Sequence, residues 1–202
     1  MQPTSPAKSL GCLRLTTPPA TDPRAVVRPF RTLLLAYEPL VEEVETLSRA
    51  MQIVRQKLLL MATPQEGPGP VHRALEAHPG ALETIVARLI DRMEGFRQQT
   101  ASLRGRFVAQ HGLALLQARA ALQLWLNRQE VGAAPPAGNL AAASARGALS
   151  SLADVEVNLD SWGRLAACPY LGREGDQWPW QEALGPRVDV QGALAHMGAL
   201  VE

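Results

Sequence analysis

Apolar residues that alternate at spacings of four and three along one long stretch constrain the fold of this chain most strongly. The repeat consists of Leu33, Tyr37, Leu40, Val44, Leu47, Met51, Val54, Leu58 and Met61. On an α-helix this spacing places every one of these side chains on the same side. Such a stripe leaves water only by packing against another helix, so the segment predicts a long helix inside a helical assembly.

The same spacing occurs twice more. The second repeat consists of Leu82, Val86, Leu89, Met93, Phe96, Thr100, Leu103 and Phe107. The third has smaller residues: Ala141, Ala145, Ala148, Leu152, Val155, Leu159 and Trp162. Aromatic residues make up only 4% of the chain, which suits a core of Leu, Val, Ala and Met. The sequence therefore predicts an all-α fold, an antiparallel bundle of three long helices with heptad, coiled-coil-like packing and additional shorter helices.

Prolines and capping residues suggest where each helix begins and ends. The first helix is expected to begin near Phe30, to break or kink at 36–38 before Pro39, and to end near Ala62. The second either runs as one helix over 80–129 or divides at Gly112. We favour one helix, because only a glycine and no proline interrupts it.

The third repeat follows Asn139, a good capping residue, and is expected to form a helix that ends near Trp162. Over 155–161 apolar residues also alternate as in a β-strand, but the heptad pattern is longer and favours a helix. Asp189 is expected to cap a last short helix that carries Val190, Leu194, Met197 and Val201.

Prolines and glycines divide the chain into three parts. Residues 1–29 are predicted to be a disordered, basic, proline-rich tail, 30–162 a helical bundle, and 163–202 an irregular aromatic segment plus a short C-terminal helix on the bundle. The basic tail also has the charge balance of an organelle-targeting peptide, although its prolines disfavour an amphipathic helix.

Two observations bear on localisation. The chain has two cysteines and no apolar secretion signal near residue 1, so we expect the cytoplasm or another reducing intracellular compartment. The longest apolar run, 113–126, contains Arg119 and Gln123, which argues against a membrane span.

Motifs for catalysis are lacking in the sequence. It contains no phosphate-binding loop, no HExxH and no CxxC, so we expect no catalytic residues, no cofactor, no metal site and no small-molecule substrate. Glu42, Glu43 and Glu45 are interpreted as acids in the opening turns of the long helix, where the helix dipole favours carboxylates.

Bulky aromatic residues gather in the segment after the third repeat. Trp178, Trp180 and Tyr170 either cap the open end of the bundle or anchor a protein partner, since Trp and Tyr are common at binding hot spots. We favour capping, and keep these three residues as candidates for partner binding.

A basic stretch suggests an alternative function. Between Glu94 and Asp154 the only acid is Glu130, and the same interval contains Arg97, Arg104, Arg106, Arg119, Arg128 and Arg146. Arginines on one helix face can contact phosphates. The sequence therefore favours a non-enzymatic scaffold or adaptor subunit that packs its helices against itself or a protein partner. The alternative is a nucleic-acid-associated structural protein that uses the Arg97–Arg146 face.

Overall fold

The computed structural model describes residues 24–62, 73, 77–132, 140–167 and 185–200. These residues form four helices and no strand: α1 (Arg24–Ala62), α3 (Pro79–Gly132), α4 (Leu140–Ala167) and α6 (Val190–Gly198). The all-α prediction is confirmed for this part of the chain, including the helical assignment of 155–161. The aromatic segment 168–184 and residues 1–23 lie outside the described residues.

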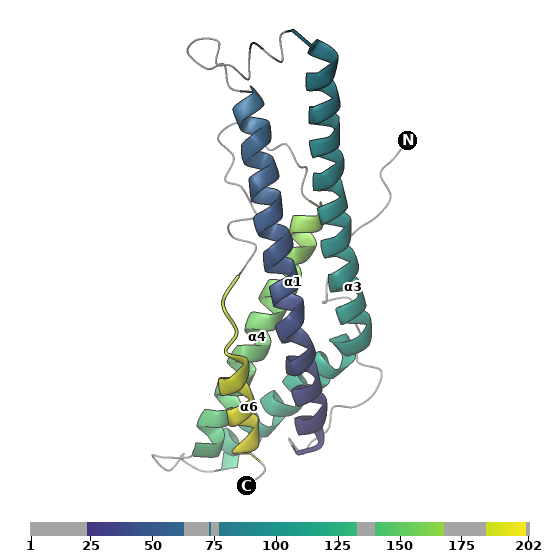
Figure 1. The fold of residues 1–202 in the computed structure, drawn as a ribbon. Helices are drawn as coiled ribbons and strands as arrows, with labels where there is room; N and C mark the ends of the chain where they lie inside the picture. The colour runs from purple at the N-terminus through teal and green to yellow at the C-terminus, as the bar shows by residue number, and fades with distance from the viewer. Residues whose placement is uncertain (1–23, 63–72, 74–76, 133–139, 168–184, 201–202) are drawn as a thin grey trace.

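The helices form an elongated assembly in which α1 and α3 run side by side in opposite directions (Figure 1). α3 packs on α4, α4 on α6, and α6 returns to α1, so the lower half is a closed ring of four helices. α4 ends about halfway up, and α3 changes direction in its lower part (Figure 1). The upper half is therefore an arm of two helices, α1 and α3, which we call the α1–α3 arm.

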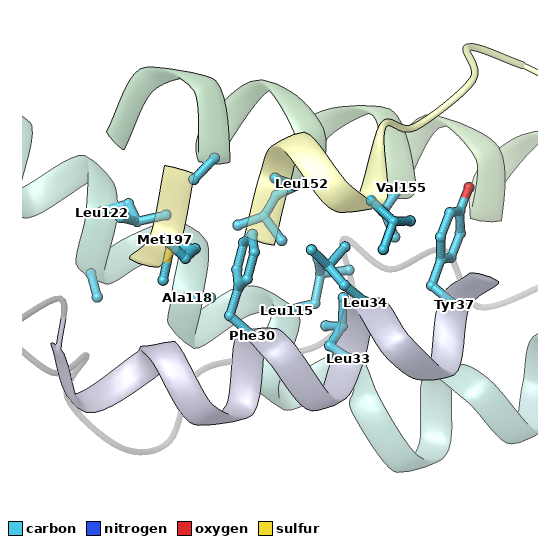
Figure 2. Close-up of a cluster of buried hydrophobic side chains, with 14 of the residues drawn as sticks. Phe30, Leu33, Leu34, Tyr37, Leu115, Ala118, Leu122, Leu152, Val155 and Met197 are labelled. Carbon is cyan, nitrogen blue, oxygen red and sulfur yellow. The ribbon is translucent and has the colours of Figure 1, made fainter. Parts of the chain in front are cut away.

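The main core lies inside the ring and receives side chains from all four helices (Figure 2). Phe30, Leu33 and Leu34 of α1 have no exposed surface, and they face Leu115 of α3 and Leu152 of α4. These contacts join segments far apart in the sequence. Leu33 and Leu152 belong to the first and third heptad repeats, whereas Phe30, Leu34 and Leu115 lie outside the repeats, so the ring core extends beyond the predicted stripes.

A second, smaller core joins the arm to the end of α4. Its members are Met51, Val54 and Leu58 of α1, Leu89 and Met93 of α3, and Leu165 of α4. In the first repeat seven of the nine positions are buried, and the other two, Leu47 and Met61, are half-buried. The stripe is thus an inward-facing surface along the whole of α1.

The start of α1 differs from the prediction. The helix begins at Arg24 and passes through Pro29 and Pro39 without a break, whereas the sequence pattern predicts a disordered tail over 24–29 and a break or kink at 36–38. Each proline removes one backbone hydrogen bond. Val27 and Phe30 pack into the main core on either side of Pro29, and this burial offsets the loss. The predicted end at Ala62 is confirmed.

The observed ends of the other helices agree more closely with the predicted ends. α3 is one helix of 54 residues through Gly112, as favoured. α4 continues to Ala167 and not to Trp162, because Leu165 is drawn into the second core and is 1% exposed. The Asp189 cap of α6 is confirmed, since its carboxylate accepts a hydrogen bond of 2.9 Å from the backbone N–H of Gly192.

Candidate functional site

The arginines of the proposed nucleic-acid face do not share one face. Arg97 donates from Nε and Nη2 to the carbonyl of Ala166, at 3.2 and 3.0 Å, and from Nη1 to Glu94. It thereby satisfies a free carbonyl in the last turn of α4. Arg104 donates from Nε to the carbonyl of Leu159 at 2.6 Å and lies 3.9 Å from a carboxylate oxygen of Asp160. Both side chains tie α3 to α4.

A third arginine is also engaged between these helices. Arg119 forms an ion pair with Glu156 of α4. Burial raises the pKa of the Glu156 carboxyl, and the charge of Arg119 opposes that rise. Of the five candidate arginines on α3, which are Arg97, Arg104, Arg106, Arg119 and Arg128, only Arg106 and Arg128 are exposed without an ion pair to another described residue. The structure does not bring the five together.

The acids at the middle of α1 also have a different setting from the one predicted. Since α1 begins at Arg24, Glu42, Glu43 and Glu45 lie several turns inside a helix of 39 residues and not in its opening turns. The helix dipole acts within the first turn, so it does not explain them. Glu45 pairs with Arg49 at 2.9 Å, whereas Glu38, Glu42 and Glu43 are exposed and have no ion pair among the described residues.

A groove between α1 and α3 lies beside these acids. Its volume is about 590 Å³, and its lining consists of Pro39, Glu42, Glu43, Thr46, Leu47, Gln99, Ser102, Leu103 and Arg106. Leu47 and Leu103 are half-buried and form its apolar part. The groove thus combines two leucines with carboxylates from α1 and one guanidinium from α3.

A buried polar centre lies where α1, α4 and the segment before α6 meet. Asn158 Nδ2 donates to Tyr37 Oη at 2.6 Å and to the carbonyl of Pro186 at 2.9 Å. Tyr37 is 1% exposed, and its ring stacks on Trp162 with the centroids 5.9 Å apart. Burial raises the pKa of Tyr37 to about 12, although the hydrogen bond from Asn158 opposes the rise. Sequence reasoning missed Asn158, whose only signal is its position three residues after Val155 on the flank of the third stripe.

Gly185 lies directly against the Asn158 side chain of this polar centre. Its φ is +50°, and a Cβ there would stand 1.7 Å from Asn158 Oδ1. That oxygen is buried and has no hydrogen-bond partner among the described residues. A cleft of about 1000 Å³ lies above the centre, between the 185–191 segment and the α1 acids. Because Asn158 already uses both N–H groups within the protein, we assign it to holding α6 in place and not to catalysis.

Other candidates have no structural support in the described residues. Trp178, Trp180 and Tyr170 fall outside them. The described part of the chain contains no cluster of three or more His, Cys, Asp or Glu residues suited to a metal ion. None of its helices is long and apolar enough to cross a membrane.

The surfaces most suited to interaction are thus the α1–α3 groove and the exposed apolar side chains of the long helices. Among these side chains, Leu35, Ile53, Leu113, Leu140 and Val157 are each close to half exposed or more. Comparisons with protein-family models, with curated proteins and with solved structures find no match to this chain.

Proposed function

We propose that this protein is a non-enzymatic scaffold or adaptor subunit, which acts by packing its long helices against a copy of itself or another protein. The observation that carries the proposal is the α1–α3 arm, which extends past the end of α4 (Figure 1). When two helices pack only against each other, each leaves part of a wide apolar arc exposed to water. Ile53 on α1 and Ile85 on α3 accordingly stay 54% and 37% exposed.

The heptad spacing gives this arm the geometry of a partner helix site. Positions on both sides of a heptad stripe are available to a third or fourth helix, as in coiled coils and bundles. Val86 and Leu82 of α3 are half-buried and adjoin the exposed Ile85. A helix laid along the arm would therefore bury apolar surface that the free chain leaves in water.

The nucleic-acid alternative has weaker support. Electrostatic binding to nucleic acid requires several cations that reach phosphates at once. Arg97, Arg104 and Arg119 are held by groups of α3 and α4, as described above. Two exposed arginines on one helix make a small basic surface.

Light scattering of the purified chain, with and without added nucleic acid, tests the proposal. The scaffold role predicts a mass above 21.8 kDa that rises with protein concentration and is unchanged by nucleic acid. Salt-sensitive binding to DNA or RNA by a chain that stays monomeric at every concentration would contradict it.

A further inference from the structure

The outer side of α1, opposite its heptad stripe, carries a regular row of exposed residues. We call this row the outer stripe, and it consists of Leu35, Glu38, Glu42, Thr46, Arg49 and Ile53. Spacings of three and four keep these six residues on one side of the helix. Glu42 and Thr46 line both the α1–α3 groove and the cleft beside 185–191, so the stripe lies between these two hollows. Its two ends are apolar, since Leu35 is 48% and Ile53 54% exposed.

Charges along this part of α1 change sign near the middle of the helix. Residues 38–45 include four acids and no base, whereas 46–62 include three bases and no acid. The Arg49 side chain is 69% exposed and pairs with Glu45 through Nη2, and a guanidinium has further N–H groups for a second carboxylate. A surface that is acidic at one end and basic at the other complements itself when a second copy is turned end to end.

We propose that the outer stripe packs antiparallel on the outer stripe of a second copy of this chain. Leu35 and Ile53 are eighteen residues apart, which is about five helical turns, so both point to the same side. A two-fold axis at the level of Val44 then sets Leu35 of each copy on Ile53 of the other. The same register sets Glu38 of each copy opposite Arg49 of the other. The inference rests on the proposed function, since it names the partner for helix packing and the face that is used.

The position of this axis allows a long contact. Val44 lies close to the middle of α1, so the two helices of 39 residues overlap over nearly their whole length. The core of each copy lies on the opposite side of α1, where Val44 has no exposed surface, so the bodies of the two copies point away from each other. The interface is isologous, with each contact made twice and the assembly closed at a dimer.

The charges also select the orientation. A parallel pair would set Glu38 on Glu38 and Arg49 on Arg49, and like charges in contact disfavour that arrangement. The antiparallel register has one unfavourable feature. It brings Lys57 of one copy within about one helical turn of Arg28 and Arg31 of the other, and all three are exposed. Changing Lys57 therefore tests the register itself.

Charge exchange tests the pairing. Variant one is Glu38→Arg and variant two is Arg49→Glu. Each variant alone sets like charges opposite each other in both contacts, so we expect its apparent dissociation constant to rise about tenfold or more relative to the parent. An equimolar mixture restores opposite charges in both contacts and should regain the parental dimer. In a parallel pair neither change alone would weaken the dimer, because each replaces one like-charged contact by another.

A third variant, Lys57→Glu, tests the register by a gain of affinity. It turns the repulsion from Arg28 and Arg31 into attraction, so the apparent dissociation constant should fall by about threefold or more. Arg128→Glu and Arg164→Glu are the controls, because both residues are exposed and lie outside α1 and outside the α1–α3 arm. They should dimerise like the parent.

Sedimentation equilibrium over about 1 to about 100 μM chain gives the mass of each sample, within the range where micromolar association is visible. Melting temperatures within a few degrees of the parent would show that the variants fold. If the parent assembles and both charge variants assemble equally well alone, the outer-stripe contact is wrong and the scaffold role stands on another surface. A parent chain that stays at 21.8 kDa throughout overturns the dimer and leaves the adaptor role to a different protein. Salt-sensitive binding of that monomer to DNA or RNA overturns both.

Discussion

At the scale of single residues, the Asn158 amide joins three separate parts of the fold. Its Nδ2 connects α4 to Tyr37 of α1 and to Pro186 before α6, residues that lie 121 and 28 positions away. A buried amide that makes both bonds stabilises one arrangement of the helices, and one that loses its partners is costly.

Replacing Asn158 by Ala should lower the free energy of unfolding by about 2 to 3 kcal/mol. The change leaves the Pro186 carbonyl without its donor and opens a cavity beside Tyr37. Urea unfolding followed by circular dichroism measures it. Ser150→Ala, on the exposed side of the same helix, is the control and should change stability by less than about 0.5 kcal/mol. Equal stability of the two variants would contradict the assigned role.

Tyr37 should make stability depend on alkaline pH. Its pKa is about 12 in the folded protein against 10.0 for an unburied tyrosine, so the folded state holds the phenol proton more tightly. This contribution is fully present below pH 10 and is lost as pH rises from about 10 to about 12, amounting to about 2 to 3 kcal/mol. Urea unfolding across that range checks it. The Tyr37→Phe variant should lose less free energy of unfolding than the parent between pH 10 and 12. Equal losses in the two proteins would contradict the raised pKa of Tyr37.

Gly185→Ala should destabilise the fold, because both its φ of +50° and the nearby Asn158 Oδ1 exclude a methyl group. We expect a loss of about 1 to 3 kcal/mol, with α6 detached first. Gly105→Ala is the matched control, since a Cβ there meets no atom within 4 Å. In the middle of α3 that change should stabilise by about 0.5 to 1 kcal/mol. The same sign for both variants would contradict this account of Gly185.

At the scale of elements, α1 shows how a heptad stripe divides one helix into two environments. Met51 has no exposed surface, whereas Ile53, two residues on, is 54% exposed. Leu47, in the middle of the stripe, is only half-buried because it lines the groove. The stripe defines the inner side, but its edge depends on where the neighbouring helix lies.

Substituting Asp at these positions separates the two sides. Met51→Asp buries an unpaired carboxylate and should cost about 3 kcal/mol or more, while Leu47→Asp should cost less, since water reaches that site. Ile53→Asp should change monomer stability by less than about 1 kcal/mol. Thermal and urea unfolding give the order. A Met51→Asp protein as stable as Ile53→Asp would mean that α1 packs by another face.

At the scale of the whole molecule, the ring and the arm differ in how many helices surround each core. The ring core is enclosed by α1, α3, α4 and α6, whereas the arm core has α1 and α3 with only Leu165 from α4. Stability within a protein follows such differences in local packing.

Amide hydrogen exchange should therefore be faster in the arm than in the ring. In dilute protein we expect residues 55–62 and 79–88 to exchange before 28–37 and 115–126. Mass spectrometry of peptides from these ranges measures the order. Leu165→Ala should speed exchange in the arm and leave the ring unchanged. Equal protection of arm and ring in the dilute monomer would contradict the two-helix description of the arm.

Local pattern was enough to predict that α1, α3, α4 and α6 are helices, although not every helix end. Heptad spacing depends only on residues three and four apart. Its stripe is largely buried in α1 and in α4, whereas in α3 only four of the eight positions, Leu89, Met93, Thr100 and Phe107, are buried. The Asp189 cap and the end of α1 at Ala62 are equally local, and both were found. Helical period and capping chemistry decide these features within one or two turns of the chain.

Tertiary structure decided the features that depend on distant partners. Burial of Val27 and Phe30 carries α1 through Pro29, and burial of Leu165 extends α4. The roles of Arg97 and Arg104 come from carbonyls 69 and 55 residues away, so no local pattern distinguishes them from Arg128, which stays exposed. Asn158 meets Tyr37 only because α1 and α4 lie together. The sequence by itself therefore determined the helical segments and the inward side of α1 and α4, and the packing of the helices determined which polar groups are paired within the protein and which stay exposed.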